Sequence, residues 1–156
     1  MGVSGSGKTT IGQLLAQTLG WQFFDADDFH SAANVDKIRR GVPLTDEDRA
    51  PWLASMRQAI VSWISAGTNA VLACSALKDS YRDQLRVGPD VQFVYLKGSQ
   101  DLIRRRLMLR HGHFATEKIL ASQLETLQEP SDAVTVDTTP VPPEIVAEIR
   151  SQLGLQ

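Results

Sequence analysis

Apolar positions along the chain follow a helical period in some stretches and a strand-like pattern in others. A stripe of apolar residues every three or four positions is clearest in three stretches, which we predict as amphipathic helices. Their apolar positions are Ile11, Leu14, Leu15 and Leu19; Trp52, Met56, Ala59, Ile60, Trp63 and Ile64; and Ile145, Val146, Ile149 and Leu153. Pro51 favours the first position of the second helix, with 45–49 as a separate turn before it.

Two more helices are predicted, over 32–40 and over 101–110 with Ser99 as its N-cap. Between the helices lie short apolar segments at 21–25, 70–74, 91–96 and 134–137, which we predict as strands. The uninterrupted run at 70–74 is typical of a strand that is covered on both faces. Alternating strands and helices predict a parallel sheet between two helical layers, and ligands of such sheets bind at the carboxyl ends of the strands.

A complete phosphate-binding pattern stands at the start of the chain. Residues 2–9 read Gly-Val-Ser-Gly-Ser-Gly-Lys-Thr and match G-x-x-x-x-G-K-[ST] at every fixed position. Glycines let backbone N–H groups converge on phosphate oxygens at the positive end of the next helix. Lys8 would reach the β- and γ-phosphates, and the Thr9 hydroxyl would face Mg²⁺. The predicted nucleotide-binding residues are Gly2, Val3, Ser4, Gly5, Ser6, Gly7, Lys8, Thr9 and Thr10.

A simple glycine-rich helix cap is the alternative, which the complete match disfavours. A phosphate loop normally follows a buried central strand of about five residues, whereas only Met1 precedes Gly2 here. We therefore expect a sheet of about five strands whose first strand is truncated, and a natural protein that starts several residues upstream.

The acids that accompany the phosphate loop follow the second predicted strand. The apolar run 70–74 ends without an acid, but residues 25–30 read Asp-Ala-Asp-Asp-Phe-His. This pattern resembles small-molecule P-loop kinases such as shikimate kinase. The resemblance implies that Asp25 orients Mg²⁺ through water, and that Asp27 contacts the acceptor hydroxyl and accepts its proton. The alternative is a solvated acidic turn that caps the next helix.

Composition narrows the range of partners. The 156 residues are 42% hydrophobic and 22% charged, and 16 basic against 18 acidic residues give a net charge of −2. This balance provides no broad basic surface for nucleic acid or an anionic membrane. No apolar run approaches the roughly 18 residues of a membrane span, and the single cysteine, Cys74, excludes an internal disulfide. We expect one soluble, cytoplasmic domain over 1–156.

Several further segments, in the same order along the chain, resemble the gluconokinase family. They are residues 1–8, 24–30, 43–53, 73–83, 110–114 and 123–130. The phosphate loop alone is unspecific, but the other five segments together are specific. The resemblance implies transfer of the γ-phosphate of ATP to D-gluconate, which gives 6-phospho-D-gluconate. It also implies Mg²⁺, a nucleoside-monophosphate-kinase-like fold and a homodimer.

Gluconate is a polyol with one carboxylate, so its site needs cations and mixed hydrogen-bonding groups. Arg49, Lys78 and Arg82 are the candidate cations, the last two being four residues apart on one helical face. Each of the three has a plain alternative as a surface ion-pair partner. His30 would donate to a substrate hydroxyl or only cap the helix that begins near residue 31.

Basic residues also mark the end of the 101–110 helix. In this family an arginine-bearing helix leads into a mobile lid, expected here over about 106–125. Arg106 and Arg110 share a helix face and are candidate phosphate clamps. His113 would contact the substrate beside a hinge at Gly112, a more favoured role than a metal site with His111. Residues 138–141 lie where related kinases hold adenine.

We therefore expect Lys8, Asp27, Arg106 and Arg110 to carry out phosphoryl transfer to gluconate. One alternative is a kinase of another small polar acceptor, such as shikimate or a different sugar acid. Another is a non-catalytic nucleotide switch or a nucleic-acid-linked ATPase. The acids at 25–30 argue against nucleic acid because they would repel its backbone.

Overall fold

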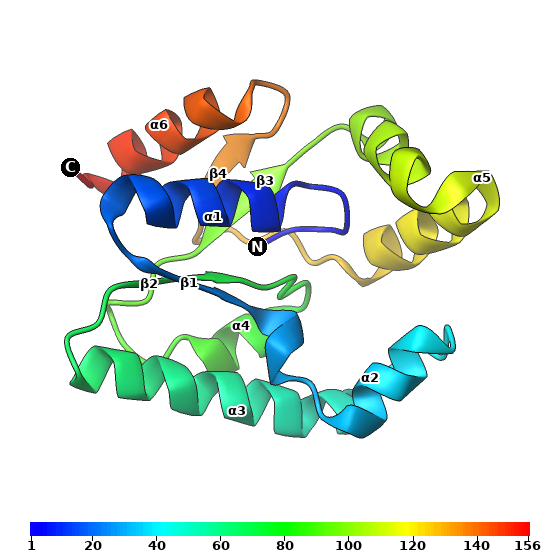
Figure 1. The fold of residues 1–156 in the computed structure, drawn as a ribbon, viewed down its shortest axis with the longest axis horizontal. Helices are drawn as coiled ribbons and strands as arrows, with labels where there is room; N and C mark the ends of the chain where they lie inside the picture. The colour runs from blue at the N-terminus through cyan, green and yellow to red at the C-terminus, as the bar shows by residue number, and fades with distance from the viewer.

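The elements alternate between helices and short strands along the chain (Figure 1). The computed structural model describes residues 1–156, apart from the side chains of residues 111–116. In chain order the elements are α1 (Lys8–Leu19), β1 (Gln22–Asp25), η1 (Ala26–Phe29), α2 (Ala32–Arg39), α3 (Asp46–Ser65), β2 (Ala70–Ala73), α4 (Asp79–Leu85), β3 (Val94–Lys97), α5 (Gln100–Thr126), β4 (Val134–Asp137) and α6 (Pro142–Leu153).

All described strand pairs are parallel. Strand β1 pairs with β2 from Gln22↔Ala70 onward, and β3 pairs with β4 from Val94↔Val134 onward. The backbone of Met1 and Gly2 joins these two pairs. Leu96 N–H donates to the Met1 carbonyl at 2.9 Å, and Gly2 N–H donates to the Ser75 carbonyl at 3.2 Å. Residues 1–2 thus take the central place at which the sequence predicts a further strand.

Helices cover both faces of the sheet, as the alternation predicted (Figure 1). Successive residues of a strand point to opposite faces, and β2 shows the consequence. Val71 packs with the layer of α1 and α6, whose centre includes Ile11 and Ile145. Leu72 packs with the layer of α3 and α4, whose centre includes Met56. The three-layer α/β fold is therefore confirmed.

Helix α3 differs from its predicted start. It begins at Asp46, so the segment 45–49 is not a separate turn and Pro51 lies inside the helix. A capping box explains the earlier start: Asp48 N–H donates to the Thr45 hydroxyl at 3.1 Å, and Thr45 N–H donates to the Asp48 carboxylate at 3.0 Å. Acidic side chains in the first turn also favour the positive end of the helix dipole. These gains outweigh the hydrogen bond that Pro51 cannot make.

Helix α5 is longer than predicted, and its two arms fold back on each other (Figure 1). Arg104 Nε lies 2.8 Å from a carboxylate oxygen of Glu117, although a straight helix would separate these residues by roughly 20 Å. Leu107 on the outgoing arm and Leu120 on the return arm share one core cluster with Val3 of the phosphate loop. The return arm therefore lies against the loop. The Arg104–Glu117 ion pair links the two arms.

Candidate active site

The phosphate loop links the Met1–Gly2 segment to the N-terminus of α1. Gly5 and Gly7 have φ angles of 85° and 97°, a region that favours glycine. The Lys8 ammonium folds back over the loop and donates to the Val3 carbonyl at 3.0 Å. Burial is the main cause that lowers the pKa of Lys8. The loop is thus curled, and the Lys8 ammonium lies against its backbone.

A cavity of about 240 Å³ opens beside this loop. Its lining includes Lys8 and Thr9 from α1, Asp25 and Asp27 from the end of β1, and Gln123 from the return arm of α5. The site therefore lies at the carboxyl edge of the sheet, as predicted. Of the residues predicted from the sequence, the two acids, Arg110 and most of the phosphate-loop set meet around this space; the loop residues are Ser4, Gly5, Gly7, Lys8, Thr9 and Thr10.

Thr9 and Asp25 form a pair of oxygen donors at the mouth of β1. The Thr9 hydroxyl donates to the Asp25 carboxylate at 3.2 Å, and the other Asp25 oxygen accepts Asp27 N–H at 3.0 Å. Hydroxyl and carboxylate oxygens are ligands that Mg²⁺ prefers, together with phosphate oxygens. Among the residues with described side chains, no group of three or more His, Cys, Asp or Glu residues could hold a metal ion. A magnesium ion at this pair would therefore need phosphate and water ligands as well.

Asp27 is the second acid of the cavity. Burial raises its pKa above the usual 3.8, and the neighbouring Asp25 charge raises it further. A carboxylate whose protonated form is favoured in this way is a better proton acceptor than a fully solvated one. Asp25 lies beside Thr9, and Asp27 follows two residues later in η1. The roles that the family resemblance implies for the two acids stay predictions.

His30 stacks on Trp52, with ring centroids 4.5 Å apart and planes 9° from parallel. Its Nδ1 lies 3.5 Å from the side-chain nitrogen of the buried Asn34, which can only donate, so Nδ1 acts as the acceptor. The proton of a neutral ring is then on Nε2. Burial lowers the pKa of His30, which favours this neutral form. Ser31, rather than His30, caps α2 through its hydroxyl.

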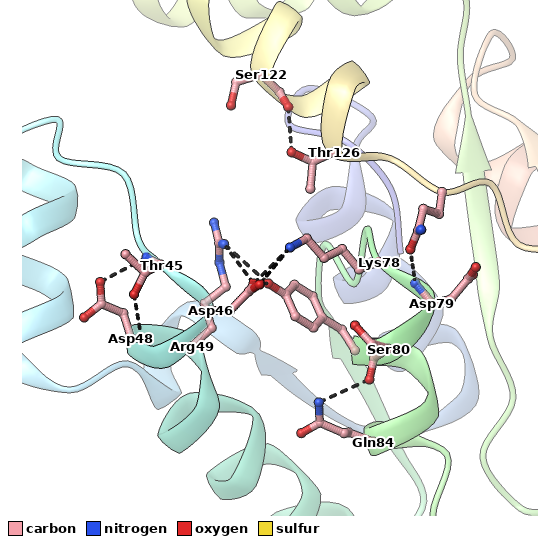
Figure 2. A network of polar contacts seen from close by, with 12 residues as sticks. Thr45, Asp46, Asp48, Arg49, Lys78, Asp79, Ser80, Gln84, Ser122 and Thr126 are labelled. Atoms are coloured by element: carbon pink, nitrogen blue, oxygen red, sulfur yellow. Dashed lines mark hydrogen bonds and ion pairs between the residues drawn. The ribbon is translucent and has the colours of Figure 1, made fainter.

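Arg49 and Lys78, two of the three candidate cations, meet at one acid. Figure 2 shows them on opposite sides of Asp46. The Lys78 ammonium lies 2.9 and 3.1 Å from the two Asp46 oxygens, and the Tyr81 hydroxyl also donates to Asp46. Arg49 is held more loosely, at 4.0 Å from Asp46 and 3.4 Å from the Tyr81 oxygen. Lys78 is therefore committed to Asp46, whereas most Arg49 donors have no partner among the side chains that the structure describes.

Arg82 does not join this group. Its side chain is 3% exposed, and its guanidinium donates to the Ala76 carbonyl at 2.7 Å, to the Gln128 carbonyl at 2.8 Å and to the Asp79 carboxylate. These contacts give Arg82 a structural role, because they connect α4 to the segment that follows α5. With its donors used in this way, Arg82 is poorly placed to bind gluconate, contrary to the sequence prediction.

Replacing Arg82 with Met tests this revision. Loss of the guanidinium leaves two carbonyl oxygens without their charged donor, so we expect the free energy of unfolding to fall by about 2–3 kcal/mol. Thermal and urea unfolding will measure the loss. A variant of unchanged stability whose KM for the acceptor rises more than tenfold would restore Arg82 to the substrate site.

The two lid arginines lie at different depths. Arg106 donates to the Thr138 carbonyl at 2.7 Å and comes within 3.5 Å of the Ser6 carbonyl. Arg106 and Arg110 both line a second cavity of about 280 Å³ beside the phosphate loop, with Pro142 and Ile145 of α6. Arg110 borders both cavities. The predicted contact of His113 and the hinge at Gly112 lie outside the side chains that the structure describes.

The sequence prediction missed Asp46, Trp52 and Gln123. Trp52 was predicted as a position of an apolar helix stripe, but it lines the main cavity and donates from Nε1 to the Ala26 carbonyl at 2.7 Å. Asp46 and Gln123 lie inside two of the family-like segments, 43–53 and 123–130, and this resemblance was the signal that could have found them.

Among the helices that the structure describes, none has the length and apolar character of a membrane span.

Comparison with known proteins agrees with this geometry. A family profile described as Shikimate kinase matches residues 4–153. A protein of Mus musculus named Probable gluconokinase is 44% identical over 98% of this chain and 95% of its own length. The Gluconokinase of Gluconobacter oxydans is 51% identical over 85% of this chain and 75% of its own length. The chain belongs to the gluconokinase family of P-loop kinases.

A solved gluconokinase of Sinorhizobium meliloti extends the match to three dimensions. It is 40% identical, with a TM-score of 0.87, and the match covers 99% of this chain and 89% of its own chain. The likeness to the gluconokinase family therefore extends over the whole fold that carries the phosphate loop, the acids after β1 and the two arms of α5.

Proposed function

We propose that this protein transfers the γ-phosphate of ATP to the primary hydroxyl of D-gluconate, with Mg²⁺ as cofactor. Membership of the gluconokinase family supports this proposal. The observation that carries it is that Lys8 of the phosphate loop and Asp27 line the same cavity. A nucleotide switch needs a lysine such as Lys8 to bind phosphate. An acid with a raised pKa in the same cavity, such as Asp27, suits phosphoryl transfer to a hydroxyl.

In the proposed reaction the hydroxyl oxygen bonds to the γ-phosphorus while the bond from that phosphorus to the β,γ-bridging oxygen breaks and ADP leaves. Asp27 orients the hydroxyl and accepts its proton, which then passes to solvent. Lys8 neutralises charge on the phosphates. The transition state is loose, so orientation and charge neutralisation contribute more than base strength. Thr9 and Asp25 would hold Mg²⁺, which neutralises phosphate charge when bound.

We assign the gluconate carboxylate to Arg49. Lys78 already faces both oxygens of Asp46, whereas the guanidinium of Arg49 stays loosely held at the edge of the same cluster. After burial, the Arg49 charge also lowers the pKa of His30, and His30 would donate from Nε2 to a substrate hydroxyl. Arg106 and Arg110 would clamp the phosphates as part of a lid over 106–125 that excludes water.

Arg49→Lys should raise the KM for gluconate about 10- to 100-fold and leave the KM for ATP within twofold. A lysine ammonium is a point charge and cannot replace the planar fork that binds a carboxylate through two hydrogen bonds. A neutral polyol of the same length is the matched substrate control. Equal losses for gluconate and the polyol would show that Arg49 does not read the carboxylate.

A substrate panel tests the proposed function itself. ADP release is measured with gluconate, other aldonates, shikimate and nucleoside monophosphates, and we expect gluconate to have the highest kcat/KM. Highest activity with shikimate or another sugar acid would support the rival small-molecule kinase. ATP binding without transfer to any acceptor would support a nucleotide switch. We also propose a cytoplasmic homodimer; sedimentation of the purified protein tests the dimer.

A further inference from the structure

Gln123 connects the return arm of α5 to the phosphate loop. Its side-chain oxygen Oε1 accepts the backbone N–H of Ser4 at 3.0 Å, a contact between residues 119 positions apart in the chain. Gln123 also lines the same cavity as Lys8 and Asp27. The side chain is therefore at the place where the phosphate loop, the nucleotide phosphates and the acceptor would meet.

The Ser4 contact fixes which end of the amide faces the cavity. A backbone N–H can only donate, so the atom that it contacts must be the amide oxygen. The Nε2 group, with two N–H donors, is then the polar end of Gln123 left for a ligand. Among the side chains that the structure describes, Nε2 has no hydrogen-bond partner within the protein. A half-buried amide with two unused donors is a binding group for an oxygen-rich ligand.

Apolar packing holds this amide in place. Leu120 is 2% exposed and packs with Val3, Ile103 and Leu107, and Leu124 packs against the same cluster. These contacts immobilise the helical turn on both sides of Gln123. The amide therefore needs little reorganisation when a phosphate arrives, and a preorganised donor of this kind is effective where charge develops in a reaction.

We propose that Gln123 is a further catalytic residue, which donates from Nε2 to an oxygen of the phosphoryl group during its transfer. The proposal rests on the proposed kinase function. Ser4 belongs to the phosphate loop, so a side chain bonded to its N–H is close to bound phosphates. Arg110, which borders the same cavity, would neutralise charge on the phosphates, whereas the neutral amide would donate a directional hydrogen bond to one oxygen.

Two substitutions separate this role from simple fastening of the arm. Gln123→Glu keeps an oxygen for the Ser4 N–H but removes both donors, and Gln123→Met removes acceptor and donors together. We expect kcat with gluconate to fall about 100- to 1,000-fold in both variants, in the range seen for loss of one preorganised donor. Ala121→Glu, on the exposed side of the same arm, is the control for the added charge and should keep full activity.

Affinity for ADP with magnesium and aluminium fluoride, a planar mimic of the transferring phosphoryl group, provides a second readout. It should weaken by a similar factor in Gln123→Met while the Kd for ATP changes less than threefold. This readout does not depend on the acceptor, so it remains decisive if wild type fails to phosphorylate gluconate. A Gln123→Glu variant that keeps more than a third of kcat, or of the mimic's affinity, would show that Gln123 only fastens the arm and would overturn the proposal.

Discussion

Replacing Lys8 with Ala is expected to lower kcat by more than about a hundredfold, a loss of roughly 2.7 kcal/mol of transition-state stabilisation. Lys8 is half-buried, and its ammonium lies over the phosphate loop and donates to the Val3 carbonyl. In the proposed reaction it moves to the phosphates and neutralises charge on the group in transfer. Initial-rate measurements at saturating ATP and gluconate give the value directly.

The control is Lys118→Ala, which removes an exposed ammonium from the return arm of α5. Circular dichroism and thermal unfolding must show that Lys8→Ala keeps its fold, since the variant also loses the contact with Val3. A folded Lys8→Ala protein with more than about a tenth of wild-type kcat would refute the assignment of Lys8.

Features that a short stretch of sequence encodes were predictable. The phosphate loop needs glycine at Gly5 and Gly7 because of their positive φ angles, and the spacing to Lys8 and Thr9 follows from the chemistry of one ligand. Residue propensities alone do not predict which strands lie side by side. General rules for parallel sheets predicted that the acids after β1 would lie beside this loop, and the cavity contains them.

Features that depend on distant partners were not predictable in the same way. Arg82 looked like a substrate ligand because its local sequence shows a cation beside the mouth of a strand. Its actual acceptors include the Gln128 carbonyl, 46 positions away, and no local pattern encodes that contact. Gln123 was missed for the same reason, since its partner Ser4 lies at the other end of the chain.

The start of α3 shows a third kind of error. Pro51 is a strong local signal for a helix start, and the capping box at Thr45 is a competing local signal six residues earlier in the chain. The capping box satisfies two backbone donors at once, whereas an internal proline removes only one. Weighing these two signals correctly would have extended α3 to Asp46 and placed Arg49 on the helix itself.

Asp27→Asn is expected to lower kcat about 100-fold or more and to change the KM for ATP less than threefold. The amide keeps the size of the carboxylate and can still contact the acceptor, but it cannot accept the proton. Asp25→Asn is the matched comparison, because Asp25 bonds to Thr9 and should instead increase the Mg²⁺ concentration needed for half-maximal rate. The opposite pattern, with weaker ATP binding in Asp27→Asn, would mean that the two acids have exchanged roles.

The pH dependence supplies an independent check. Because burial and the Asp25 charge raise the pKa of Asp27, its proton-accepting form is lost on acidification at a higher pH than for an ordinary aspartate. The acid limb of kcat/KM should therefore lie above pH 3.8 in wild type and disappear in Asp27→Asn.

The raised pKa of Asp27 also has a consequence for stability. A carboxyl group whose pKa is raised by folding destabilises the protein once pH exceeds its unfolded pKa, so Asp27→Asn should melt at the same temperature as wild type or higher at neutral pH. An Asp27→Asn variant that loses both activity and thermal stability would point to a structural role for Asp27. An Asp27→Asn variant whose kcat/KM keeps the same acid limb would assign that limb to another group.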